Sequence, residues 1–192
     1  MALPPALIRP SDVEADRLKL QLRLVLLEVQ ESSRQNFIDF ARYVWPAGII
    51  SGHHQKMASA FDRIIDGTLK RLIIAMPPRH SKSEYASYLL PAYAMGRKPD
   101  LKLIQATHTA ELAVRFGRKV RNLMDTDTYK EVFPDVLLKA DSKAAGRWDT
   151  NHGGESFSVG VGGAMTGRGA NLLIIDDPHS EQDALSASAL EN

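Results

Sequence analysis

The pattern of apolar and polar positions predicts a chain in which strands and helices follow one another. An apolar run over 72–75 predicts a short buried strand, and residues 84–95, rich in Ala, Leu and Tyr, predict a helix. Two more apolar stretches, 101–107 and 171–175, predict strands, and so does the alternating stretch 155–161. These elements indicate a folded domain that combines helices with strands.

Further helices are expected before and after the strand at 101–107. The first opens at a capping box, Ser11 to Glu14, and two more cover 34–44 and 57–65. A fourth helix, capped by Thr107 or Thr109, is expected to run to about Met124. The remaining segments are expected to lack long elements: residues 1–10 form a loose arm, and residues 125–150 form loops with short helical pieces.

The first helix has a broad apolar face, which includes Val13, Leu18, Leu22 and Val29. Two interpretations of this face stay open. It packs against the helix's own domain, which we favour, or it contacts a partner or another subunit.

Candidate chemistry begins where the strand at 72–75 ends. A loop over 76–81 leads into Lys82 and Ser83 at the start of a helix, which is the arrangement of a phosphate-binding P-loop. Backbone N–H groups at a helix N-terminus attract anions, and a lysine adds a mobile positive charge for the β- and γ-phosphates. The Ser83 hydroxyl is suited to Mg²⁺. Arg79, His80 and Ser81 would lie under the phosphates.

The loop departs from the usual pattern at both glycine positions, which are Met76 and Ser81 here. Serine is small enough to let a phosphate approach, and Met76 indicates ordinary extended angles where the loop begins. The alternative is an ordinary strand–turn–helix in which Lys82 and Ser83 have no special role.

A second motif, the strand ending at Asp176 and Asp177, has the form of a Walker B motif. Asp176 would bind Mg²⁺, directly or through water, and Asp177 would orient the attacking water. Glutamate is the better-known residue at the second position, so Glu181 stays open as the alternative catalytic carboxylate. The competing interpretation is a strand that ends in a solvated turn.

Other polar residues are weaker candidates. Gln55, upstream of the P-loop, has the amide chemistry that reads adenine, whereas His53 and His54 are interpreted as cap or surface residues. Arg168, in the glycine-rich turn 162–169, would stabilise charge on the γ-phosphate of a neighbouring subunit's ATP, and Arg79 is the competing candidate.

A cluster of basic residues lies on the helix that ends near Met124, and it fits either a solvated face or a phosphate backbone. Its members are Arg115, Arg118, Lys119 and Arg121.

Composition limits these interpretations. The 192 residues are 44% hydrophobic and 24% charged with a net charge of +1, which is typical of one globular domain and excludes a polycation. There is no cysteine, hence neither disulfides nor thiol chemistry. No apolar run approaches the roughly 20 residues that span a bilayer, and no signal peptide is recognised.

Five stretches in this order resemble one known family. They are Pro77–Ser83, Ala106–Ala113, Tyr129–Asp135, Gly162–Gly169 and Ile174–Pro178. Together, over about residues 35–192, they look like the N-terminal ATPase domain of the large terminase subunit of tailed bacteriophages and prophages. The resemblance implies an α/β fold: a RecA-like P-loop NTPase of the additional-strand, catalytic-glutamate class. Its mainly parallel central sheet would be flanked by helices and preceded by N-terminal helices.

The same resemblance implies a motor that uses ATP and Mg²⁺ to move double-stranded DNA into a procapsid. Implied partners are the small terminase subunit, the portal or procapsid, and further copies in a homo-oligomeric ring, with a monomer as the alternative state of this chain. The implied location is the cytoplasm of the bacterial host. The ATPase domain would cover 11–192, without the family's nuclease domain and the segment that follows Walker B. Two other functions stay open: a degenerate P-loop module for assembly or DNA docking, and another DNA-dependent ATPase such as a helicase.

Overall fold

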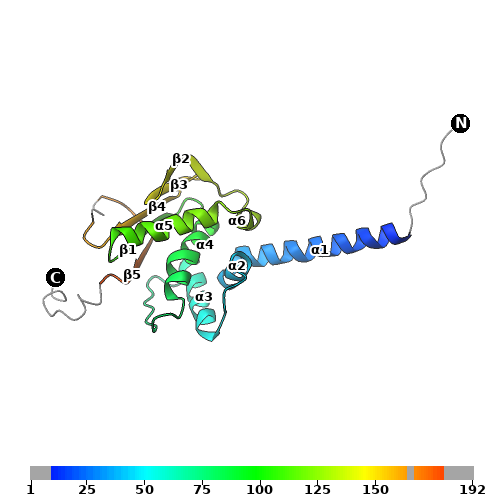
Figure 1. Ribbon diagram of the computed structural model, residues 1–192, viewed down its shortest axis with the longest axis horizontal. Helices are drawn as coiled ribbons and strands as arrows, with labels where there is room; N and C mark the ends of the chain where they lie inside the picture. Colours follow the sequence, from blue (N-terminus) through cyan, green and yellow to red (C-terminus); the bar gives the residue numbers. More distant parts are fainter. Residues whose placement is uncertain (1–9, 164–166, 180–192) are drawn as a thin grey trace.

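The structure of the chain, a computed structural model, describes residues 10–163 and 167–179 (Figure 1). The helical elements are α1 (Pro10–Gln35), α2 (Phe37–Val44), α3 (Gly52–Ile65), the π-helix η1 (Glu84–Leu89), α4 (Leu90–Arg97), α5 (Ala110–Met124) and α6 (Asp127–Val132). The strands are β1 (Lys102–Thr107), β2 (Leu138–Ala144), β3 (Arg147–Thr150), β4 (Glu155–Gly160) and β5 (Leu172–Asp176). The predicted α/β class is confirmed.

The five strands form one mixed sheet in the order β2-β3-β4-β1-β5. The pairs β4–β1 and β1–β5 are parallel, whereas β2–β3 and β3–β4 are antiparallel. The expectation of a mainly parallel sheet is therefore not confirmed. Thr107 lies opposite both Gly160 and Asp176, so the carboxyl ends of the three parallel strands meet at one edge.

The hairpin of β2 and β3 was not predicted, although the short helix α6 within 125–150 was. The sequence of β2, LKADSKA, lacks the β-branched and aromatic residues that favour strands. Its partner β3 is anchored by Trp148, which is fully buried and donates its indole N–H to the carbonyl of Gly117. Tertiary packing therefore creates a strand that local sequence does not indicate.

The predicted strand over 72–75 is wrong. This segment forms no strand, and Ile73 is 94% exposed. A strand requires a neighbouring backbone with which to exchange hydrogen bonds. Among the described strands, β5 is the edge strand of the sheet and pairs with β1 alone, so residues 72–75 do not pair with it. Apolar composition alone does not make residues 72–75 a strand here.

An aromatic core joins the helices to one another. Phe37 of α2 contacts Phe61 edge-on at 5.0 Å and Tyr93 at 5.5 Å between ring centroids. Tyr129 of α6 is buried and donates its hydroxyl to the carbonyl of Ala92 at 3.0 Å. Helix α5 packs on β1 and β4, and η1 contacts both α5 and β5. The helical layer thus fixes η1 beside the carboxyl end of β5.

Helix α1 leaves this body and extends away from it (Figure 1). Only its C-terminal part is held, for example where Arg34 donates to the carbonyl of Val132. Most of its large apolar side chains are exposed. The favoured interpretation, packing on its own domain, is therefore wrong for most of the helix. The helix begins at Pro10, and the capping side chain of Ser11 lies outside the side chains described.

Candidate functional site

Lys82 lies between two carboxylates that belong to the end of β5. Its Nζ is 2.5 Å from Asp177 Oδ1 and 3.6 Å from Asp176 Oδ1. The hydrogen bond that Lys82 donates to Asp177, together with the negative charges of Asp177 and Asp176, raises the pKa of Lys82, although partial burial opposes this shift. Lys82 and Asp177, which are 95 residues apart in sequence, therefore lie side by side, and the two predicted motifs meet. The raised pKa keeps Lys82 positively charged.

The backbone explains why both carboxylates reach the lysine. Asp176 ends β5 with its side chain 7% exposed on the helical side of the sheet. Asp177 has a positive φ of 45°, which turns the chain out of the strand direction. Its carbonyl accepts a hydrogen bond from the N–H of His108 at 3.2 Å, next to the end of β1. Consecutive residues of a regular strand point to opposite faces, so this turn allows both to serve one site.

Ser87 is a site residue that the sequence analysis missed. Its hydroxyl donates to Asp176 Oδ2 at 2.8 Å, and both groups are buried. Ser87 lies in the π-helix η1, and its carbonyl accepts from Gln105 Nε2 of β1 at 2.7 Å. π-helical turns are rare and frequent at functional sites. The sequence offers one indication that Ser87 belongs to the site. Ser87 follows Ser83 by four residues, so both side chains project from a similar side of a helix.

The loop before Lys82 contains two residues in the left-handed conformation, which is a feature of anion-binding turns. Arg79 and Ser81 have positive φ angles of 65° and 60°. Alternating left- and right-handed residues turn successive N–H groups toward one point. The carbonyl of Ser81 accepts from the N–H of Tyr85 at 3.0 Å, which joins the loop to η1. Ser81 thus adopts the conformation of the glycine it replaces, while Ser83 is half-buried at the start of η1.

His54 connects helix α3 to this loop. The N–H of Ser51 donates to His54 Nδ1 at 3.1 Å, which confirms His54 as a cap residue. His54 Nε2 lies 3.3 Å from the carbonyl oxygen of His80, and its ring stacks on Tyr85 at 4.4 Å. Burial, followed by the neighbouring His53, lowers the pKa of His54. A neutral ring with its proton on Nε2 satisfies both contacts.

The other predicted ligands of the nucleotide lie around this loop. Gln55 is exposed on the first turn of α3, one residue after His54. Arg79 and His80 are exposed on the loop, and His80 Nδ1 lies 2.9 Å from the carbonyl oxygen of Pro78.

Arg168 is not brought to Lys82. Its guanidinium carbon lies 4.1 Å above the ring of Phe157 in β4. The neighbouring Ser158 faces Gly117 of α5, so Phe157 points to the other face of the sheet. Arg168 therefore lies on the opposite face from Ser87. Glu181 and residues 164–166 of the glycine-rich turn lie outside the described residues.

The basic cluster of α5 divides into two parts. Lys119 donates to both oxygens of Glu84 at 2.7 and 2.8 Å, and its ammonium lies 4.6 Å from the ring centre of Tyr88. Glu84 directly follows Ser83, so Lys119 supports the start of η1. Arg115 and Arg118 are exposed.

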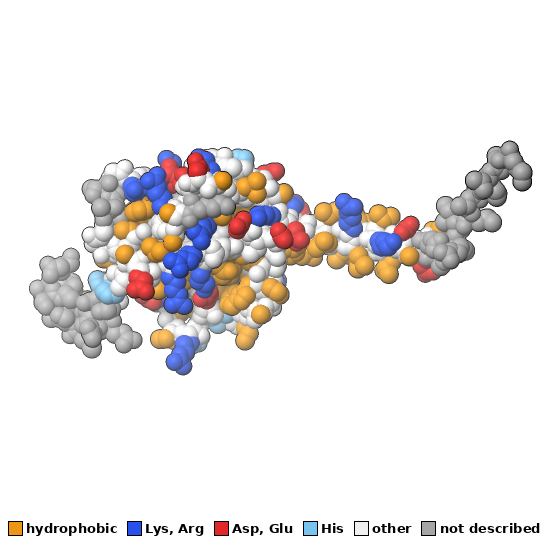
Figure 2. Space-filling view, turned by 45° about the horizontal axis from the view of Figure 1, so that its top comes forward, with side chains coloured by type: hydrophobic (Ala, Val, Ile, Leu, Met, Phe, Trp, Pro, Cys, Tyr) orange, Lys and Arg blue, Asp and Glu red, His pale blue; other side chains and the backbone are white. Residues whose placement is uncertain are grey.

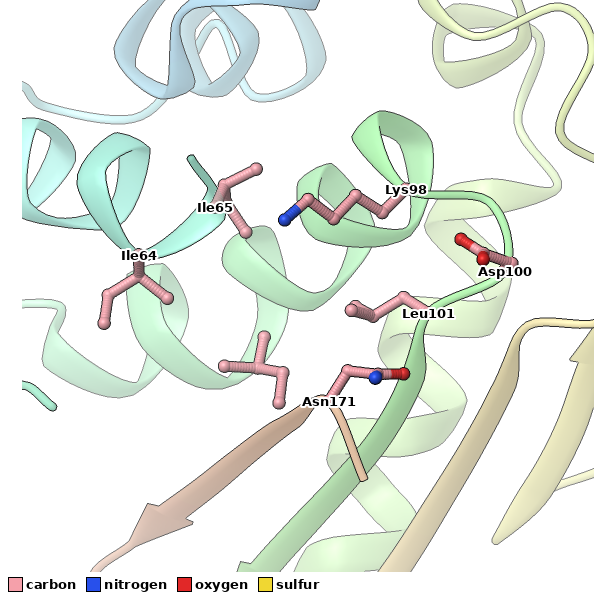
Figure 3. A pocket seen from close by; sticks show the side chains of 7 residues that line it. Ile64, Ile65, Lys98, Asp100, Leu101 and Asn171 are labelled. Carbon is pink, nitrogen blue, oxygen red and sulfur yellow. The ribbon is translucent and has the colours of Figure 1, made fainter. Parts of the chain in front are cut away.

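A pocket of about 230 Å³ lies at the amino ends of β1 and β5, at the opposite edge of the sheet (Figure 3). Figure 3 shows Lys98, Asp100 and Asn171 around it together with apolar side chains. It contains none of the predicted site residues.

No helix within the described residues is both long and apolar enough to cross a bilayer.

The donor set suits magnesium more than a transition metal. In the described ranges, no three His, Asp, Glu or Cys side chains gather as a metal cluster. The Asp176 carboxylate and nearby hydroxyls are hard oxygen donors, and Mg²⁺ is commonly held by one or two carboxylates together with substrate phosphates.

No model of a known protein family matches the chain, and no similar protein was found among curated proteins.

Proposed function

We propose that this chain binds ATP with Mg²⁺ and hydrolyses it as the motor domain of a DNA-packaging terminase. The observation that carries the proposal is the position of Lys82, which follows a loop with two left-handed residues and contacts both carboxylates after β5. A cation, a loop with left-handed residues before a helix and a strand-end carboxylate are among the parts that enzymes use for phosphoryl transfer. The RecA-like class and the packaging role rest on the motif order described above.

Each residue then has a defined task. When ATP binds, Lys82 would release its hydrogen bond to Asp177 and contact the β- and γ-phosphates instead. The backbone N–H groups of residues 79–83 would hold those phosphates. Ser83 and Asp176 would hold Mg²⁺, which would neutralise charge on the phosphates. Released from Lys82, Asp177 becomes free to orient the attacking water, with Glu181 as the alternative. Gln55 would contact adenine.

Lys82 also links metal and nucleotide binding. In the present arrangement the single charge of its ammonium offsets about half of the charge of the two carboxylates, a role that Mg²⁺ would take over. Two cations at such short range repel each other. Mg²⁺ binding at Asp176 would therefore weaken the hold of the carboxylates on Lys82 and favour its contact with phosphate.

Calorimetry of ATP binding with and without Mg²⁺ tests the proposal. Lys82→Ala should reduce ATP affinity at least tenfold, whereas Lys139→Ala should bind like the parent. Lys139 is an exposed lysine on β2, at the far edge of the sheet. Equal affinity of the Lys82→Ala variant and the parent would refute the site.

A second candidate function is a P-loop module that binds nucleotide without turnover. The observation that favours it is the segment 72–75, which forms no strand and so gives the loop less support than a P-loop strand would. Measuring phosphate release by the assembled protein distinguishes the two: turnover that Lys82→Ala abolishes supports the motor, and binding without turnover supports the module.

The DNA-binding part of the proposal rests on the exposed guanidinium groups of Arg115 and Arg118. Phosphate contacts make affinity fall with salt, by a log–log slope of about −0.9 per contact. Changing both to Gln should weaken binding to double-stranded DNA of any sequence and reduce this slope by about two. An unchanged slope would show that Arg115 and Arg118 do not contact the DNA phosphates. The procapsid partners, the ring and the bacterial cytoplasm follow from the same family resemblance.

A further inference from the structure

Helix α1 exposes an unusual amount of apolar surface. Nine Leu and Val side chains between positions 13 and 29 are 45–63% exposed, and their exposed fractions add up to about five fully exposed side chains. Figure 2 shows apolar side chains along the helix where it stands clear of the body. Soluble monomers seldom present a contiguous apolar patch above roughly 300–600 Å² without a binding role. The exposed apolar surface of α1 therefore indicates that the helix binds an apolar partner.

Eight of these nine apolar positions form two stripes on opposite sides of α1. With about 3.6 residues per turn, one stripe contains Leu18, Leu22, Val25 and Val29, and Ala15 extends it by one position. These spacings of three and four residues are those of the a and d positions of a heptad repeat, without a break. The other stripe contains Val13, Leu20, Leu24 and Leu27, and Arg17 interrupts it.

Charges beside the unbroken stripe match a second copy of the same helix. Glu14 and Lys19 occupy the g and e positions that flank it. In a parallel pair of helices, a g residue meets the e residue five positions later on the partner. Glu14 of each copy would then face Lys19 of the other. Within one chain Lys19 pairs with Asp16 at 3.2 Å, but both side chains are about three-quarters exposed, so that pair is weak and easily exchanged.

We propose that α1 is a self-association helix, which pairs in parallel with α1 of a second copy along Ala15, Leu18, Leu22, Val25 and Val29. The self-complementary flank and the heptad spacing favour a copy of this chain over an unrelated helix. Five apolar side chains per copy are far fewer than the roughly 20–30 residues per side of a standard interface. Association in the micromolar range is therefore expected.

Sedimentation velocity of the full chain between about 1 and 100 µM tests this proposal. The parent should form dimers or larger species, and Leu22→Glu should weaken association at least tenfold. Leu24→Glu is the matched control, because it makes the same change on the opposite stripe and should keep the association. Both positions are about 60% exposed, so neither change should alter the unfolding midpoint of the body. A monomeric parent at about 100 µM, or a Leu22→Glu variant that associates like the parent, would overturn the proposal and leave α1 to a different protein.

Oxidative crosslinking tests the direction of the pair. The chain has no cysteine, so a single Leu22→Cys change introduces its only thiol. In a parallel pair the two residues at position 22 face each other, and mild oxidation should give a disulfide-linked dimer. An antiparallel pair in the register that sets position 18 opposite position 29 would place position 22 opposite position 25. Crosslinking only in a mixture of Leu22→Cys and Val25→Cys chains would therefore refute the parallel arrangement. These measurements use no nucleotide, so they are independent of the proposed ATPase activity.

Discussion

The Ser87 hydroxyl donates a 2.8 Å hydrogen bond to Asp176 Oδ2, and this bond fixes the carboxylate that ends β5. Ser87 is 1% exposed and Asp176 is 7% exposed, so water does not readily replace the bond. The other oxygen of Asp176 faces Lys82. The π-helix η1 therefore orients the carboxylate, while Lys82 offsets part of its charge.

Replacing Ser87 with Ala should lower the free energy of unfolding by about 1–3 kcal/mol, because a buried carboxylate oxygen loses its donor. It should also weaken Mg²⁺-dependent ATP binding, because Asp176 can then rotate. Urea unfolding and calorimetry measure the two effects. Ser83→Ala is the control: Ser83 is half-buried, so its loss should reduce Mg²⁺ dependence with a smaller loss of stability. A Ser87→Ala chain as stable as the parent would show that the bond contributes little.

The structure brings three of the predicted site residues together, whereas it departs from the predicted sheet. Lys82, Asp176 and Asp177 were predicted from two local motifs, and salt bridges join their side chains in the structure. Ser87 was missed because its four-residue spacing from Ser83 is a weak signal without the π-helical turn that brings it to Asp176. The placement of Arg168 also required the fold, since only strand alternation shows that Phe157 faces away from the helices.

The two errors in the sheet have one physical cause. Residues 72–75 are apolar yet form no strand, and β2 is polar yet forms one. Strand formation depends on a partner backbone and on the packing of cross-strand neighbours, more than on intrinsic preference. An apolar run does not report which backbone lies alongside, and without such a partner Ile73 stays 94% exposed.

The lowered pKa of His54 predicts a loss of stability in mild acid. Its folded-state pKa lies below the ordinary value of 6.5, so the unfolded chain binds more protons as pH falls through 6.5. The free energy of unfolding should therefore decrease from that pH down to the folded-state pKa. His54→Gln retains a cap residue of the kind found in capping boxes but does not titrate. Urea unfolding between about pH 5 and 8 should show a steeper decline for the parent than for this variant; parallel curves would contradict the assignment.

Ser81 is strained by its φ of 60°, which predicts that glycine is tolerated there. A non-glycine residue pays roughly 1–2 kcal/mol for this conformation, while glycine costs about 0.5–1 kcal/mol in chain entropy. Ser81→Gly should therefore leave stability unchanged or raise it by up to about 1 kcal/mol. Ser83→Gly is the matched control: Ser83 has a φ of −68°, so glycine there should only destabilise. Thermal or urea unfolding of the two variants decides, and a clear loss in Ser81→Gly would show that the serine side chain itself is needed.

Arg168 lies on the sheet face opposite Ser87, which predicts that it acts on the ATP of another copy. Arg168→Ala should keep ATP affinity but lower turnover of the assembled protein by about 10³-fold or more, the usual contribution of such an arginine. Mixing this variant with Lys82→Ala chains makes the test specific. Neither protein should hydrolyse ATP alone, but a mixed assembly regains sites in which an intact Lys82 meets an intact Arg168 from its neighbour. If mixing restores nothing while Arg79→Ala abolishes turnover, the arginine acts within one chain, and Arg79, in the loop before Lys82, is the residue concerned.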